Sequence, residues 1–114
     1  MRIIAVLALG LAAATPAFAA ERTGFHAIAA GNFPMAERQI NAAMRAAPER
    51  PELMLNLAAV YLQTGRAVEA RRLYAAVLDR PAVAMDMPSG AVISSHDVAQ
   101  RGLQRLPNQD VASR

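Results

Sequence analysis

Serine, histidine and aspartate side chains stand together in the run Ser94-Ser95-His96-Asp97. These are the residue types of a hydrolytic triad, but a triad needs side chains that converge in space, and successive residues on one helical turn point in different directions. The sequence also lacks the G-x-S-x-G pattern that exposes a nucleophilic serine on a sharp turn. Capping of a helix by Ser94, with Asp97 three residues later, explains the run without chemistry. We therefore predict that the chain is not an enzyme.

A second set of residues that could do chemistry combines Met85 and Met87 with His96. Alternate residues on a strand share a face, so the two thioethers would lie side by side. Thioether and imidazole ligands together suit Cu(I). Methionines at alternate strand positions are more commonly gap-filling core residues. A small periplasmic Cu(I)-binding protein is thus the alternative function, and the main prediction includes no metal site and no cofactor.

The charge and composition of the chain exclude several classes of protein. The twelve basic residues are all arginine, against nine acidic residues, and Arg71-Arg72 is the one adjacent pair. Nucleic-acid binding would call for a cluster of basic residues, so we expect no nucleic-acid partner. The chain has no cysteine, which excludes disulfides, thiolate metal sites and a lipid anchor on cysteine. The 27 alanines favour an all-α fold.

The first nineteen residues have the pattern of a secretory signal peptide. Arg2 is followed by an apolar run, Ile3 to Ala14, then by Pro16 and the small-x-small sequence Ala17-Phe18-Ala19. The run of twelve apolar residues is shorter than the ~20 that a membrane-spanning helix needs. We expect cleavage after residue 19, no stable membrane insertion afterwards, and a periplasmic or secreted mature protein.

A repeat becomes visible when the chain is compared with itself at a shift of 34 residues. Gly31 then falls on Gly65, and Ala36 falls on Ala70. Further matches join small or apolar residues: Gly24 with Ala58, Ile40 with Tyr74, Ala43 with Val77, and Met44 with Leu78. Self-similarity at a fixed period of this length is typical of a repeat architecture.

Each unit of the repeat has the pattern of two helices. In the second unit Pro51 is suited to the first turn of a helix, and Gly65 supplies a left-handed end. A second helix is expected over residues 67–79. The apolar stripes of the two helices share helical spacing: Met54, Leu57, Ala58 and Tyr61 on the first, and Ala70, Leu73, Tyr74, Val77 and Leu78 on the second.

At these positions both units resemble tetratricopeptide repeats. The family pattern runs from a bulky residue through a leucine-glycine pair, a tyrosine, an alanine and an aromatic residue to a proline. The matching residues here are Met54, Leu57, Ala58, Tyr61, Ala70, Tyr74 and Pro81. Met54 replaces the usual tryptophan and Ala58 the usual glycine; in the first unit, Thr23 and Ala27 stand where leucine and tyrosine are usual. The resemblance implies two helix-turn-helix units over residues 20–82, in an α-α superhelix that binds proteins.

The remaining chain is expected to cover the open end of the second unit, because about three such units are usually needed for stability. Residues 83–106 read as a short β-hairpin around Pro88-Ser89-Gly90, followed by a capping helix over 95–106. Val98, Ala99, Leu103 and Leu106 would face inward and shield Leu73, Val77 and Leu78. Residues 107–114 are expected to form a flexible tail.

The resemblance implies that the first helix of each pair lines a concave groove. Glu52, Asn56, Ala59 and Gln63 form a narrow strip on that helix, flanked by Leu55 and Leu62. We predict that a protein or peptide partner binds there, and that the apolar anchors are partly exposed in the free monomer. The partner-binding residues would be Arg22, Phe25, Ile28, Leu55, Asn56, Leu62 and Gln63.

One question about the groove stays open at this point, namely what covers its apolar residues. Leu55 and Leu62 could be buried by the chain's own cap or by a second copy in a homodimer. Some members of the resembling family clamp a peptide carboxylate with lysine and asparagine side chains. Asn56 matches one such position, but Glu21 and Phe25 stand where that clamp has lysine and asparagine, so we predict that this clamp is absent.

Overall fold

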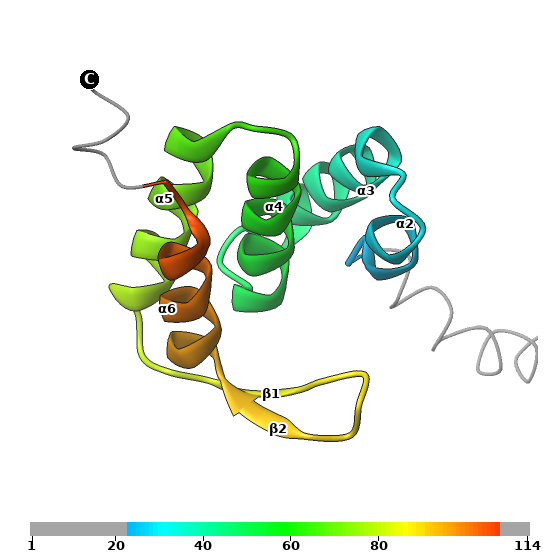
Figure 1. Ribbon diagram of the computed structural model, residues 1–114. Coiled ribbons are helices and arrows are strands. Elements are labelled where there is room, and N and C mark those ends of the chain that lie inside the picture. Colours follow the sequence, from blue (N-terminus) through cyan, green and yellow to red (C-terminus); the bar gives the residue numbers. More distant parts are fainter. Residues whose placement is uncertain (1–22, 108–114) are drawn as a thin grey trace, which may run out of the picture.

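The computed structural model describes residues 23–107 and consists mainly of helices. In chain order the elements are α2 (Phe25–Ala29), α3 (Phe33–Ala46), α4 (Pro51–Gln63), α5 (Ala67–Leu78), β1 (Ala84–Asp86), β2 (Val92–Ser94) and α6 (Ser95–Arg105). Helices α2 to α5 follow one another in a row, and α6 packs against both α4 and α5 (Figure 1). The hairpin crosses beneath the helices (Figure 1). The predicted fold class, all-α repeats with a C-terminal hairpin and capping helix, is confirmed. The expected signal peptide lies outside the described residues, as does nearly all of the expected tail.

The two turns inside the repeat units have the same backbone geometry. Gly31 and Gly65 adopt φ angles of 75° and 78°, the left-handed region that glycine enters without steric cost. The Asn32 amide donates to the Ala27 carbonyl at 2.8 Å, and the Arg66 amide donates to the Tyr61 carbonyl at 2.8 Å. The amide of Gly31 donates to the Ile28 carbonyl, and the amide of Gly65 donates to the Leu62 carbonyl. These second hydrogen bonds complete the Schellman motif in both turns. The 34-residue repeat read from the sequence is therefore a repeat of local structure.

Helix α4 is the central element of the fold. It packs against α3, α5 and α6. Leu53, Leu57 and Val60 belong to one core cluster with α2 and α3, whereas Met54, Leu55 and Ala58 belong to the other with α5 and α6. A helix with apolar residues on nearly all sides is one that is buried on nearly all sides. Ala58 and Ala70 are both 0% exposed, which fits the close approach of α4 and α5 expected from their size.

A charged contact joins the two repeat units on the outside. The Arg66 guanidinium donates two hydrogen bonds to the Glu37 carboxylate, at 2.6 and 3.2 Å, and lies over the Tyr61 ring with 4.5 Å to its centroid. Hydrogen bonding to Arg66 lowers the pKa of Glu37, and the same contact raises the pKa of Arg66. Because two guanidinium nitrogens bind the two carboxylate oxygens, the contact holds the turn before α5 against α3.

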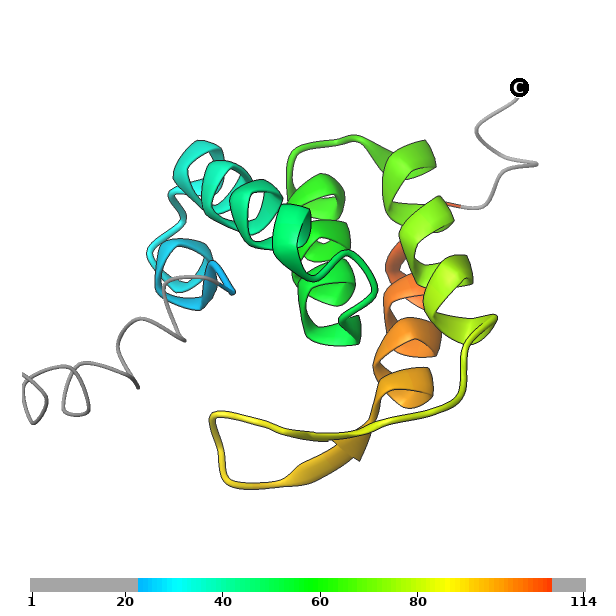
Figure 2. The same cartoon turned by 180° about the vertical axis from the view of Figure 1, so that it is seen from behind.

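The hairpin is tied to α6 at its base. Met85 pairs with Ile93 in the antiparallel register of β1 and β2. The Ser95 amide donates to the Val83 carbonyl at 2.8 Å, and the Val83 amide donates to the Ser95 hydroxyl at 2.9 Å. The Ser94 hydroxyl caps α6 by accepting from the amide of His96 at 3.1 Å. In the capping box expected from the sequence, the donor would be the amide of Asp97, one residue later. Seen from behind, the chain leaving α5 passes across the start of α6 into the hairpin (Figure 2).

Helix α6 covers the second unit as predicted. Ala99 and Leu106 are buried in the cluster of α4 and α5, and Val98 and Leu103 pack against its margin. Gly102 is buried against the Tyr74 ring, and a Cβ atom at that position would overlap the ring. Within residues 23–107, no helix combines the length and apolar character needed to cross a membrane.

Candidate functional site

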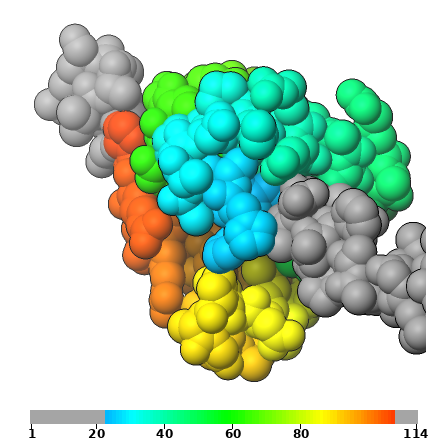
Figure 3. All heavy atoms as spheres, turned by 90° about the vertical axis from the view of Figure 1, so that its right-hand side faces the viewer, coloured from blue at the N-terminus to red at the C-terminus, as the bar shows by residue number. Residues whose placement is uncertain are grey.

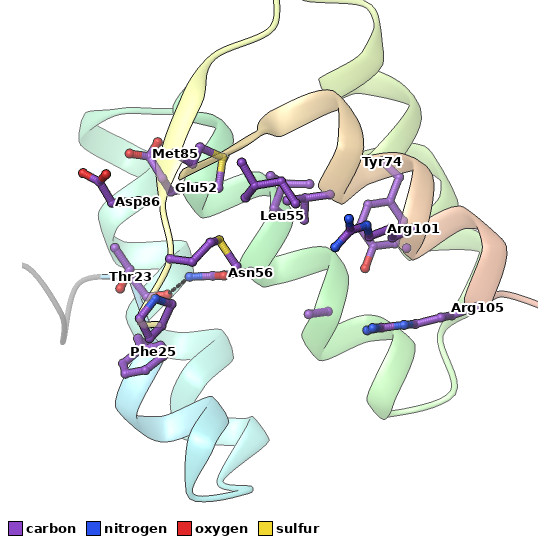
Figure 4. A pocket seen from close by; sticks show the side chains of 16 residues that line it. Thr23, Phe25, Glu52, Leu55, Asn56, Tyr74, Met85, Asp86, Arg101 and Arg105 are labelled. Atoms are coloured by element: carbon purple, nitrogen blue, oxygen red, sulfur yellow. Dashed lines mark hydrogen bonds between the residues drawn. The ribbon is translucent and has the colours of Figure 1, made fainter. Parts of the chain in front are cut away.

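A pocket of about 690 Å³ opens between α4, α6, the hairpin and the start of α2 (Figure 4). Two of its walls are helical faces with the same spacing. Helix α4 contributes Glu52, Leu55, Asn56 and Ala59, and helix α6 contributes Val98, Arg101, Gly102 and Arg105. Both sets follow the i, i+3, i+4, i+7 pattern of one side of a helix. The pocket is therefore the space between two facing helical surfaces.

The floor of the pocket depends on the absence of a side chain at Gly102. The Tyr74 ring rises from α5 beneath α6 and reaches the pocket next to that glycine. Burial raises the pKa of the Tyr74 hydroxyl, and the positive charge of Arg105 opposes the rise. The hydroxyl thus stays protonated at neutral pH and can offer a hydrogen bond from the floor.

The hairpin and the start of α2 form the remaining rim. Met85, Met87 and Ile93 supply apolar side chains from the hairpin, and Phe25 does so from α2. The space-filling view shows the hairpin, in yellow, directly beside the start of α2, in blue (Figure 3). The Asn56 side-chain amide donates to the Thr23 carbonyl at 2.8 Å, which ties the chain before α2 to the α4 wall.

Charges of opposite sign occupy opposite sides of the pocket. Glu52 and Asp86 lie beside Met85 near the hairpin, whereas Arg101 and Arg105 project from α6 on the other side (Figure 4). Glu52 forms an ion pair with Arg50 at 3.2 Å, and both of these side chains are well exposed. The apolar side chain of Leu55 lies between the two charged sides (Figure 4). The pocket can accordingly accept a ligand that is apolar in the middle and charged at its ends.

The predicted partner-binding residues fall into three groups. Phe25, Leu55 and Asn56 line the pocket, whereas Ile28, Leu62 and Gln63 do not. Ile28 packs against the core cluster formed by α2, α3 and α4. Leu62 packs against the cluster formed by α4, α5 and α6. Gln63 is exposed at the far end of α4. Arg22 lies outside the described residues.

The expectation that Leu55 is partly exposed in the free monomer is wrong. Its side chain is only 4% exposed, in the same cluster as Tyr74, Ala99 and Leu106. The physical reason is that α6 packs on α4 and covers this residue, so that only its edge reaches the pocket. Phe25 is 39% exposed, in agreement with the expectation for an anchor residue.

The hairpin and α6 both line the pocket, which was not predicted from the sequence. The sequence pattern predicts that α6 covers the core. The face of α6 formed by Val98, Arg101 and Arg105 could also have been recognised from its helical spacing. No pattern in the sequence indicates that Asp86 lies beside the pocket, because its position depends on where the hairpin folds back.

The structure does not gather the Cu(I) set in the pocket. Met85 and Met87 line it, but His96 does not. The His96 ring holds its Nε2 atom 2.6 Å from the Arg80 carbonyl, so this nitrogen is the donor and is not free to bind a metal. Residues 23–107 hold no group of three or more histidine, aspartate and glutamate side chains placed to bind a metal ion.

The Ser94–Asp97 run is explained by structural hydrogen bonds. The Ser95 side chain is 1% exposed and its hydroxyl accepts from the amide of Val83. The Ser94 hydroxyl caps α6. Neither hydroxyl is hydrogen-bonded to His96 through its ring, which is the contact that a nucleophile and its base require.

The geometry and the repeat are those of a helical repeat protein, and a comparison with family models gives the family. The model described as tetratricopeptide repeat matches residues 27–83, half of the chain. The chain belongs to the tetratricopeptide repeat family, whose members are in general non-catalytic modules for protein–protein interaction. No curated protein and no solved structure matched the chain in the two other comparisons.

Proposed function

We propose that the mature protein is a non-catalytic interaction module of the bacterial periplasm, and that it holds a segment of a partner protein in the pocket between α4 and α6. The observation that carries the proposal is the shape of this pocket. It is walled by the first helix of a repeat unit and deepened by α6 and the hairpin, which follow the repeat. Helical grooves of this kind bind peptide segments through apolar anchors.

The chemistry of the walls supports a protein segment over a catalytic substrate. The lining combines apolar side chains such as Phe25 and Ile93 with a small number of charged ones at the margins. A site of this composition orients a ligand and excludes water from its apolar part. The Ser94–Asp97 run takes no part in the lining.

Filling the pocket tests the proposal. Ala59 lies on the α4 wall and is half-buried, so Ala59→Trp would occupy the space with little effect on the core. Ala42, exposed on α3 and absent from the pocket, provides the matched control Ala42→Trp. Pull-down from periplasmic extract should recover a partner with the wild type and with Ala42→Trp, but not with Ala59→Trp. Equal recovery by all three proteins would show that the pocket is not the binding site.

The periplasmic location rests on the signal-peptide pattern of residues 1–19. Mass spectrometry of the protein from a cell fractionation should find its N-terminus at or next to Ala20 in the periplasmic fraction. An intact Met1 in the membrane fraction would contradict this part of the proposal and leave the binding site unaffected.

A further inference from the structure

The charged residues at the two sides of the pocket differ in how well the protein itself neutralises them. Within residues 23–107, Arg101 and Arg105 have no ion-pair partner. They stand four residues apart on α6, which places both Cα atoms on one side of the helix and about 6 Å apart along its axis. Two adjacent, unpaired cations at the edge of an apolar pocket favour an anion with a planar, two-oxygen head such as a carboxylate.

The opposite side of the pocket favours a cation instead of an anion. Asp86 on β1 is exposed and has no ion-pair partner among the described residues. Glu52 is paired with Arg50 only through exposed side chains, a contact that is worth little and can be exchanged for another cation. A cationic group of a ligand is therefore stabilised near Asp86 and Glu52, and disfavoured near the arginines.

The surface between the two sides is apolar and fixed. Leu55 and Tyr74 are each 4% exposed, and their edges form the base of the pocket beside Met85 and Ile93. An occupant that only carried charges would leave this surface wet, while an occupant that was only apolar would leave three charges without partners. The lining as a whole matches a chain segment with both features.

We infer that the occupant is a peptide segment with an apolar centre, an acidic end that lies at Arg101 and Arg105, and a basic end that lies at Asp86 and Glu52. This inference rests on the proposed function and adds the chemistry of the partner and the direction in which it lies. The acidic group is an aspartate or glutamate side chain or the carboxylate of a chain end, since both present the same two oxygens to the arginines.

Short synthetic peptides test the charge pattern by fluorescence anisotropy on the mature chain. Four peptides share one apolar centre and carry acidic and basic ends, one acidic end, one basic end, or two neutral ends. The peptide with both charged ends should bind most tightly, and added salt should weaken it towards the neutral peptide. Arg101→Glu with Arg105→Glu should weaken binding of the acidic-ended peptide by about tenfold or more.

A matched variant separates local from general charge effects. Arg38 is exposed on α3 and does not line the pocket, so Arg38→Glu should leave all four affinities unchanged. Asp86→Lys should weaken the basic-ended peptide and spare the acidic-ended one. Equal losses from Arg38→Glu and from the α6 variants would overturn the inference, because the effect would then follow net charge alone.

The direction of the bound peptide can be measured because the chain has no cysteine of its own. A fluorophore attached through Gln104→Cys lies beside Arg105, and one attached through Ser89→Cys lies in the hairpin turn. A quencher on the acidic end of the peptide should dim the label at position 104 more than the label at position 89. Equal quenching, or the opposite order, would contradict the proposed direction.

The inference and the proposed function fail in different ways. If all four peptides bind equally and Ala59→Trp abolishes their binding, the charge pattern is wrong and the pocket is still the site. If peptides bind but Ala59→Trp has no effect, the pocket is not the site, and the proposed function fails as well. Failure of every peptide to bind would overturn the inference, and so would a dimer in sedimentation that Ala59→Trp dissociates, because the occupant would then be a second copy.

Discussion

The two repeat units share their turns but differ in how their first helices are buried. Gly31 and Gly65 close the same hydrogen-bonded turn in units one and two. Helix α4 of unit two buries six residues, whereas the short α2 of unit one buries one, Ala27. The motif thus specifies the turn and the close helix contact, but the elements on either side decide how much of each helix is buried.

Equivalent positions in the two second helices show this contrast at the level of single contacts. Ile40 in α3 and Tyr74 in α5 occupy the same place in the repeat, and each faces a glycine. A Cβ atom at Gly24 would lie 2.8 Å from Cγ1 of Ile40, while one at Gly102 would overlap the ring of Tyr74. In unit one the glycine comes from the same unit, and in unit two from the capping helix.

The largest effect is expected from Gly102→Ala. The added methyl group meets a rigid ring on a buried face, so the helix or the ring must shift, at a cost of ~1–3 kcal/mol or more. For a domain of this size that would lower the melting temperature by roughly 4–8 °C for each kcal/mol. Calorimetry of the purified variant measures the shift directly.

Two control variants show whether the ring is the cause. Tyr74→Leu removes the overlapping atoms and should recover part of the loss when it is combined with Gly102→Ala, a coupling that a double-mutant cycle detects. Gly102→Ala should also weaken peptide binding, because Tyr74 and Gly102 both line the pocket. A melting temperature equal to that of the wild type would mean that α6 packs less closely on α5 than described.

An intermediate and equal effect is expected from Gly31→Ala and Gly65→Ala. A Cβ atom at either glycine meets nothing within 4 Å, so the cost comes from the left-handed backbone alone, ~1–2 kcal/mol. Urea denaturation of the two variants should give the same loss of unfolding free energy within error. A clearly larger loss at Gly65 would show that the two turns differ in ways that their shared geometry does not reveal.

The smallest effect concerns the ion pair between the units. Because the pKa of Glu37 is lowered in the folded protein, the pair stabilises the fold above the unfolded pKa near 4.5, and this contribution is lost as the pH falls through the lower folded value. Glu37→Gln should therefore lower the melting temperature slightly at pH 7 and make no difference at strongly acidic pH. Melting curves across that range test the sign; a larger difference in acid than at pH 7 would contradict it.

Much of the fold could be predicted from the sequence because its boundaries are marked by residues with special backbone properties. Pro51 begins α4 and Gly65 follows its end, as expected. Helix α5 ends at Leu78 and α6 at Arg105, each one residue before the predicted end. The family resemblance is confirmed by the matching family model.

The candidate site could be predicted only in part, because it depends on contacts between distant segments. The face of α4 with Leu55 and Asn56 was recognisable from helical spacing. The sequence could not show that α6 lies on Leu55, nor that the hairpin brings Asp86 to the pocket. These placements depend on how the chain after residue 82 folds back, and neither periodicity nor composition encodes that direction.

The paired hydrogen bonds between Val83 and Ser95 have a consequence for local unfolding. They join the first residue before the hairpin to the first residue of α6, so hairpin and helix should open as one cooperative unit. The hydroxyl that holds the Val83 amide is shielded, since Ser95 is 1% exposed. Amide hydrogen exchange at Val83 and Ser95 should thus report how often one wall of the pocket detaches, and a bound segment should slow both amides by the same factor.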